Sequence, residues 1–152
     1  MPHLRLQVPE EWLKAEYTAA TGFDARKLLD HLVKTVAGMR MENATGETVP
    51  LINLSNLKHA IEPLHYAHLA GDPGKRFLHC TLAAGNDTPG RTAEVRSRAA
   101  ETLGNEIDNF LFALPGYASM GCGSVTVWVQ DIDRDRGYTT TAERKKKREQ
   151  AK

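Results

Sequence analysis

A repeated order of strand, helix and strand patterns limits the possible folds of this chain more than any other feature. Apolar and polar residues alternate over residues 4–8, which predicts a strand with one buried face. DARKLLDHLVKTVAG (24–38) has its apolar residues on one helical face, and predicts a helix that Asp24 caps and Gly38 ends. LKHAIEPL (57–64) then favours a second, weaker strand.

The second half repeats this plan. RFLHCTLAA (76–84) is an apolar run of strand length, and SVTVWVQDI (124–132) alternates valines with polar residues in the clearest strand pattern of the chain. Turn signals precede and follow the first of these strands, at GDPG (71–74) and NDTPGR (86–91). Between the strands, residues 92–114 form a long helical pattern. Its apolar side holds Val95, Ala99, Leu103, Ile107, Phe110, Leu111 and Leu114.

Two such units side by side predict an α+β fold with a four-stranded mixed sheet. Each unit should join two parallel strands through a right-handed crossover, which places both helices on one face of the sheet. We expect one domain over residues 1–138, with units at about 2–64 and 76–131, followed by a basic, disordered tail at 139–152. Because the second face of the sheet has no cover of its own, the chain is also predicted to form a homo-oligomer.

Composition excludes several classes of protein. The formal net charge of +1 gives no overall field that would attract nucleic acid or a membrane. No apolar stretch reaches membrane length, and the start of the chain lacks the pattern of a secretory signal. Cys80 and Cys122 form no CxxC pair. We therefore expect two free thiols in a cytoplasmic protein.

Pro2, directly behind the initiator methionine, allows two interpretations. A proline without chemistry is tolerated at the first position of a strand. Alternatively, removal of Met1 would leave Pro2 with a free secondary amine at the end of a rigid strand. An α-amino group with a lowered pKa is a suitable general base at neutral pH.

Three stretches together resemble the tautomerase superfamily, and most closely its 5-carboxymethyl-2-hydroxymuconate isomerase branch. They are MPHL at the start, RFLHCTLAAGNDTPGRTAEVRSRAAETL in the second unit, and VTVWVQDIDRDRGY near the end. The likeness covers residues 2–8 and 55–138, and leaves 9–24 and 40–54 as insertions. It implies a tautomerase-like fold with insertions, a homotrimer, and cofactor-independent isomerisation of a small unsaturated carboxylate in aromatic catabolism. Pro2 would be the general base, with no metal or organic cofactor.

Cations near Pro2 would hold the substrate carboxylate. Where the isomerase branch carries arginines on the strand before the second unit, this chain has Lys58 and His59. A lysine binds a carboxylate as a point charge, without the two-pronged geometry of arginine. Arg40 and Arg76 are further candidates that rank lower.

Three alternatives remain open. A tautomerase-fold protein without catalysis would bind a partner through its oligomer surface or its tail. The tail has six basic and two acidic residues, but contact with nucleic acid is disfavoured because no aromatic residue is interleaved there to stack on bases. His65 and His68 have a spacing that suits a metal, yet no third ligand is evident.

Overall fold

The computed structural model describes residues 2–85, 90–132 and 141–151, with the backbone alone at 132 and 141–143. Part of the turn predicted at 86–91 and the segment before the tail helix lie outside these ranges. Among the described residues, no helix is long and apolar enough to cross a membrane. The strands are β1 (His3–Pro9), β2 (Arg40–Glu42), β3 (Thr48–Pro50), β4 (Lys58–Leu64), β5 (His68–Leu69), β6 (Asp72–Gly85) and β7 (Cys122–Ile132). The α-helices are α1 (Ala15–Thr21), α2 (Ala25–Gly38), α3 (Ala93–Phe112) and α4 (Thr141–Gln150), and the short 3-10 helices are η1 (Glu10–Leu13), η2 (Leu54–Asn56) and η3 (Tyr117–Ser119).

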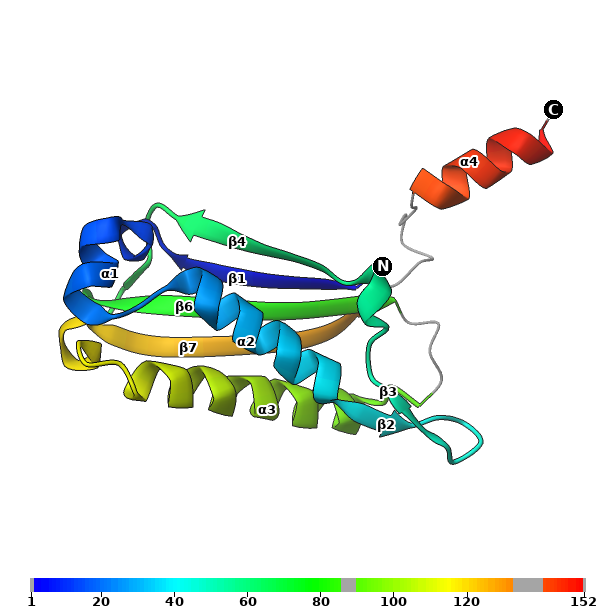
Figure 1. Ribbon diagram of the computed structural model, residues 1–152, viewed down its shortest axis with the longest axis horizontal. Coiled ribbons are helices and arrows are strands. Elements are labelled where there is room, and N and C mark those ends of the chain that lie inside the picture. The colour runs from blue at the N-terminus through cyan, green and yellow to red at the C-terminus, as the bar shows by residue number, and fades with distance from the viewer. Residues whose placement is uncertain (1, 86–89, 133–140, 152) are drawn as a thin grey trace.

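The main sheet has the order β4-β1-β6-β7 (Figure 1). A short further strand, β5, pairs with the beginning of β6. β1 and β4 are parallel, β6 and β7 are parallel, and the two pairs meet where β1 runs antiparallel to β6. The predicted four-stranded mixed sheet, built from two strand–helix–strand units, is therefore confirmed.

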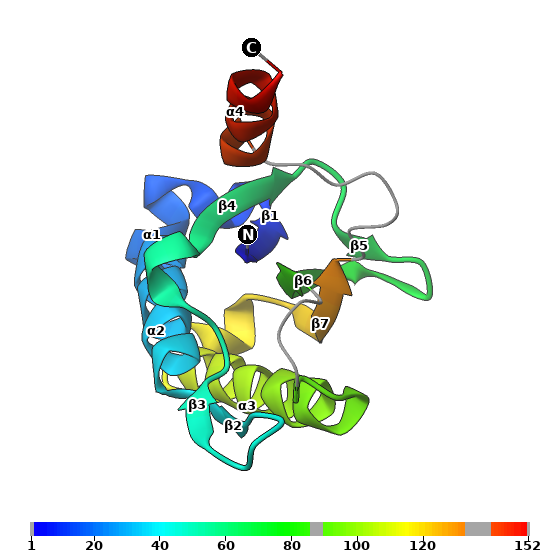
Figure 2. The same ribbon diagram turned by 90° about the vertical axis from the view of Figure 1, so that its right-hand side faces the viewer.

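Helices α2 and α3 lie on the same face of the sheet and pack against each other (Figure 2). The alternation of β1 buries Leu4, Leu6 and Val8 completely under these helices. Asp24 caps α2 as predicted, because its side chain accepts hydrogen bonds from the backbone N–H groups of Arg26 and Lys27. Along α3, the predicted apolar side forms the other half of the core. Its fully or largely buried members are Ala99, Leu103, Ile107 and Leu111.

Three segments differ from the sequence prediction. The turn predicted at GDPG (71–74) lies one residue earlier, at 70–71, where it joins β5 to β6, and β6 already begins at Asp72. The segment 40–54 contains the hairpin of β2 and β3, whose three-residue strands are too short to show a period in the sequence. The tail predicted to be disordered carries α4, and every side chain from 144 to 150 is exposed.

The second face of the sheet is open within one chain. It carries polar as well as aromatic side chains: Arg5 pairs with Glu62 on it, at 3.5 Å. Beside this pair, the His79 ring lies between Phe77 and Trp128, tilted against Phe77 with ring centroids 4.8 Å apart and stacked on Trp128 with centroids 6.4 Å apart. Trp128 is 60% exposed. The open face thus offers an aromatic patch, Phe77–His79–Trp128, to a partner.

Candidate functional site

Pro2 lies at the centre of one end of the sheet. It directly precedes β1, which lies between β4 and β6. The next residue, His3, is opposite Lys58 on β4 and opposite Ala83 on β6. The Pro2 carbonyl accepts a hydrogen bond of 3.0 Å from the N–H group of Lys58. Pro2 is half-buried. Figure 2 looks onto this end of the sheet, where the chain begins.

A cavity of about 580 Å³ lies at the same end of the molecule. Two parts of its lining lead toward the strand ends around Pro2. One is 50–54, which lines the cavity and leads through η2 into the Lys58 contact. The other is Arg91, which also lines the cavity and donates to the Gly85 carbonyl at the end of β6. Arg40 forms a further part of the wall, whereas Pro2 itself is not among the lining residues.

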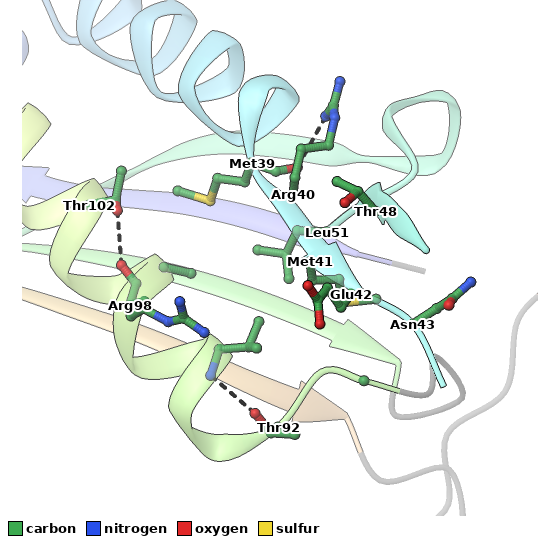
Figure 3. A pocket seen from close by; sticks show the side chains of 13 residues that line it. Met39, Arg40, Met41, Glu42, Asn43, Thr48, Leu51, Thr92, Arg98 and Thr102 are labelled. Carbon is green, nitrogen blue, oxygen red and sulfur yellow. Dashed lines mark hydrogen bonds between the residues drawn. The ribbon is translucent and has the colours of Figure 1, made fainter. Parts of the chain in front are cut away.

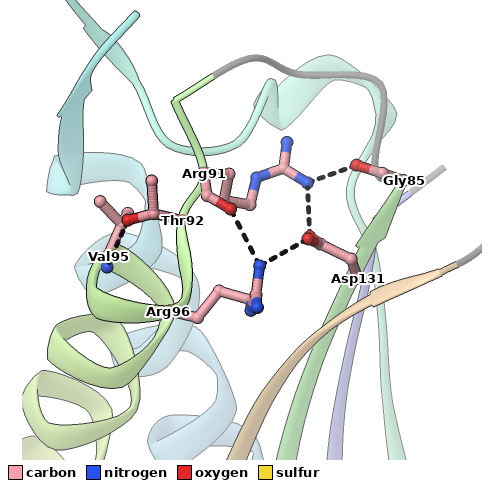
Figure 4. Close-up of polar contacts among 6 residues, drawn as sticks. All are labelled: Gly85, Arg91, Thr92, Val95, Arg96 and Asp131. Atoms are coloured by element: carbon pink, nitrogen blue, oxygen red, sulfur yellow. Dashed lines mark hydrogen bonds and ion pairs between the residues drawn. The ribbon is translucent and has the colours of Figure 1, made fainter.

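Arg91 is the most deeply buried arginine of this site, with 6% of its side chain exposed. Both of its side-chain contacts use one nitrogen, Nη1, which donates to the Gly85 carbonyl and lies 3.3 Å from Asp131 Oδ1 (Figure 4). Its buried Nε has no hydrogen-bond partner among the described residues. A buried donor without a partner is rare and costly in a folded protein. The Nε–Nη2 edge, which can grip a carboxylate with two parallel hydrogen bonds, is therefore not used by the described part of the chain.

Helix α3 begins next to Arg91. Thr92 is its N-cap, and the Thr92 hydroxyl accepts a hydrogen bond of 3.2 Å from the Val95 N–H group. The amino end of a helix carries a partial positive charge, which adds to the charge of a guanidinium placed there. Together, Arg91 and the start of α3 favour an anion at this end of the sheet.

A second cavity, of about 670 Å³, lies between the β2–β3 hairpin and α3. Its floor is apolar, with Met41 and Leu51 almost completely buried, and Arg98 and Thr102 stand on its α3 side (Figure 3). Arg40 and Leu51 line both cavities. The two cavities are thus neighbours that share part of a wall.

The four cations predicted from the sequence are not brought together. Lys58 lies beside Pro2, and Arg40 lines the cavity, although its Nη1 donates to the carbonyls of Ala37 and Met39. His59 follows Lys58 on a strand, so its side chain lies on the opposite face of the sheet. Arg76 is at the other end of β6, where it forms an ion pair with Glu11.

The Arg76 prediction is therefore wrong for a site built within one chain. Sequence reasoning placed Arg76 on the correct strand but at the wrong end, because a 14-residue strand separates its two ends widely. It also missed Arg91, which precedes a helix in a turn and belongs to no apolar period. The GR pair at 90–91, directly before the Thr92 cap, was the available signal.

The surroundings of the His3 side chain disfavour positive charge. Burial first, and then the neighbouring cations Lys58 and Arg5, lower the pKa of His3 below the ordinary value. His3 directly follows Pro2 in the chain.

Among the described residues, Cys80, Cys122, His65 and His68 form no catalytic pair with one another. Cys80 is buried in the core and Cys122 is partly buried, and both are free thiols as predicted. His65 pairs with Glu10, and His68 contacts the Pro73 carbonyl. In the described ranges, no three His, Cys, Asp or Glu side chains gather as metal ligands do.

The sequence matches no protein-family model and no curated protein. Solved structures do match. A crystal structure of 5-carboxymethyl-2-hydroxymuconate delta-isomerase has a TM-score of 0.62 and 16% identity, over 93% of this chain and 87% of that one. A 5-carboxymethyl-2-hydroxymuconate isomerase from Deinococcus radiodurans R1 has a TM-score of 0.57 and 16% identity, over 91% and 88%. The symmetric trimer of wild-type Q0 fused 4-OT has a TM-score of 0.52 and 15% identity, over 93% and 98%. The chain therefore has the fold of the tautomerase superfamily, as the sequence resemblance predicted.

Proposed function

We propose that the protein is a cofactor-independent tautomerase that moves a proton between carbons of a small unsaturated keto or hydroxy acid of the 2-hydroxymuconate type. The observation that carries this proposal is the buried guanidinium of Arg91, whose Nε has no partner in the described chain. Arg91 lines a cavity at the end of the sheet where Pro2 lies. Isomerases of the same fold, at low identity, support the reaction class.

In this proposal Met1 is removed and the Pro2 nitrogen is the general base. An ordinary α-amino group has a pKa of about 7.7–8.0. The desolvation and the cations that lower the pKa of His3 would also lower that of an amine at Pro2. The amine would then be neutral near pH 7 and able to accept a proton.

The proton transfer needs no external reagent. The lone pair of the Pro2 nitrogen takes a proton from one carbon of a keto acid, and the electrons of that C–H bond move onto the carbonyl oxygen to give a dienolate. With an enol acid such as 2-hydroxymuconate, the proton comes instead from the enol hydroxyl, and the same dienolate results. The protonated amine then returns the proton to another carbon of the conjugated system. Arg91 would hold the substrate carboxylate, and Arg40 or Lys58 would stabilise the negative charge that develops on oxygen.

The test is a comparison of three variants after mass spectrometry has shown whether Met1 is absent. Ketonisation of 2-hydroxymuconate and phenylenolpyruvate is followed by absorbance. Pro2→Ala keeps a free amine but loses the ring that fixes the direction of its lone pair, and should lower kcat by about 10²-fold, the usual cost of a misplaced catalytic group. Arg91→Ala should mainly raise KM. Arg26→Ala, which removes an exposed positive charge from α2, is the matched control and should change neither constant.

Full activity of Pro2→Ala would contradict the proline mechanism. A wild-type chain without Met1 that turns over no enol acid, yet binds carboxylates through Arg91, would contradict catalysis. That result would favour the alternative of a non-catalytic binding protein.

We also propose that the chain forms a homotrimer through the open face of its sheet. The support is the exposed aromatic patch Phe77–His79–Trp128, together with the trimeric assembly of one structure of the same fold. Sedimentation velocity should show a trimer for the wild type and smaller species for Trp128→Glu. Tyr66→Glu is the control, since Tyr66 is 88% exposed and lies outside the patch. A monomeric wild type would contradict this assembly.

A further inference from the structure

A carboxylate lies between two arginines at the end of β7 (Figure 4). Asp131 Oδ1 is 3.3 Å from Nη1 of Arg91, and Asp131 Oδ2 is 2.7 Å from Nη1 of Arg96. The same nitrogen of Arg96 donates to the backbone carbonyl of Arg91, at 2.9 Å. Arg91 is therefore held twice, by its backbone through Arg96 and by its side chain through Asp131.

We propose that Asp131 is a positioning residue, which fixes the guanidinium of Arg91 so that its Nε–Nη2 edge is kept for the carboxylate of the substrate. This inference rests on the proposed role of Arg91. Asp131 and the Gly85 carbonyl both bind Nη1, so each contact directs the same corner of the guanidinium away from the ligand edge. Without Asp131, the long side chain of Arg91 would sample other rotamers, and part of its affinity for a carboxylate would be lost in ordering it.

Arg96 makes this arrangement compatible with anion binding. If Asp131 were paired with Arg91 and with no other cation, its charge would cancel that of Arg91. Because the second oxygen of Asp131 is taken by Arg96, the group of two arginines and one aspartate keeps a net positive charge. Asp131 is 23% exposed and Arg91 6% exposed, so solvent screens their charges only in part.

Charge alone and positioning predict opposite effects for the loss of Asp131. Removing a negative charge near the site should strengthen the binding of an anion if only Coulomb forces matter. Removing the group that orients Arg91 should weaken it. The sign of the change therefore separates the two explanations.

The experiment measures binding of sorbate, an unsaturated monocarboxylate, and of its neutral amide sorbamide, by titration calorimetry on the full chain. We expect Asp131→Ala to weaken sorbate binding about 10-fold or more, in line with the cost of a misplaced binding group. Sorbamide affinity should stay the same, because it has no carboxylate for Arg91. Unchanged or tighter sorbate binding by a folded Asp131→Ala chain would overturn the proposal.

Two further measurements secure the result. Asp131→Asn keeps the volume of the side chain and serves if Asp131→Ala does not fold. It should weaken sorbate binding by a smaller factor, since a neutral amide is a weaker acceptor than a carboxylate. In a chain that already carries Arg91→Ala, Asp131→Ala should have no additional effect on sorbate. An equal effect in both backgrounds would show that Asp131 does not act through Arg91.

Failure of the proposed function gives a different pattern. A wild-type chain that is inactive on enol acids but prefers sorbate to sorbamide would refute the catalysis alone, and the Asp131 comparison would still decide the positioning role. A wild-type chain that binds sorbate no better than sorbamide would refute the role of Arg91, and with it this inference.

Discussion

Gly90 gives the most quantitative prediction for the architecture of the site, because it lies where α3 approaches the β2–β3 hairpin. Its φ angle is +93°, and a Cβ built on it would collide with the backbone oxygen of Glu42. Gly46, in the hairpin turn, has a φ angle of +80° but nothing within 4 Å of its Cβ position. Gly46→Ala therefore measures the backbone penalty alone, and Gly90→Ala measures the same penalty plus a collision.

An L-residue in the left-handed conformation costs about 1–2 kcal/mol, which is the effect expected of Gly46→Ala on the free energy of unfolding. Overpacking adds about 1–3 kcal/mol, so Gly90→Ala should cost about 2–5 kcal/mol. Urea unfolding followed by tryptophan fluorescence measures both values. Because Gly90 directly precedes Arg91, Gly90→Ala should also weaken sorbate binding, while Gly46→Ala should not. Equal costs for the two substitutions would refute the close approach of α3 to the hairpin.

Three further predictions concern stability and reactivity. Gly104→Ala should raise the free energy of unfolding by about 1 kcal/mol, because alanine favours a helix and its Cβ would lie 3.8 Å from Val127 Cγ2, in ordinary contact; a loss in urea unfolding would show that α3 has no room for a methyl group. Burial raises the pKa of the Cys80 thiol to about 12, so iodoacetamide at neutral pH should modify Cys122 well before Cys80, and equal rates in the folded chain would contradict the core. The pKa of His3 is lowered in the folded chain, whereas in the unfolded chain it has the ordinary value of about 6.5. As the pH falls below 6.5, the unfolded chain therefore binds more protons than the folded chain. The free energy of unfolding should fall as the pH drops below this value, and His3→Asn should make that fall shallower; the same slope in His3→Asn would assign the effect to other groups.

The fold could be predicted because its signals are local and repeated. The alternation of Leu4, Leu6 and Val8, and the apolar face of α2 behind its Asp24 cap, follow from burial on one side of a strand or helix. The order of these patterns then determined the topology. The short strands of the hairpin and the long first part of β6 could not be predicted in this way, because neither buries a regular stripe.

The site depends on where strands end, and this is harder to obtain from a sequence. The backbone of Lys58 lies beside Pro2, because Lys58 begins β4 and Pro2 directly precedes the adjacent parallel strand β1; a role of the Lys58 side chain in binding stays a prediction. Arg91 and Asp131 were missed because they come from different elements and meet only in three dimensions. In retrospect, Asp131 had a signal. It continues the every-second-residue series of Val127 and Val129, and so places a charge on the face that packs against α3.

The central claim is that Pro2 carries a free amine that is neutral near pH 7, and one measurement tests it directly. The protein is labelled with ¹⁵N-proline and titrated by NMR as isolated from cells. One proline nitrogen should titrate below the ordinary α-amino range of about 7.7–8.0. If no proline nitrogen titrates because Met1 is retained, or if Pro2 titrates within that range, the proposed base is contradicted.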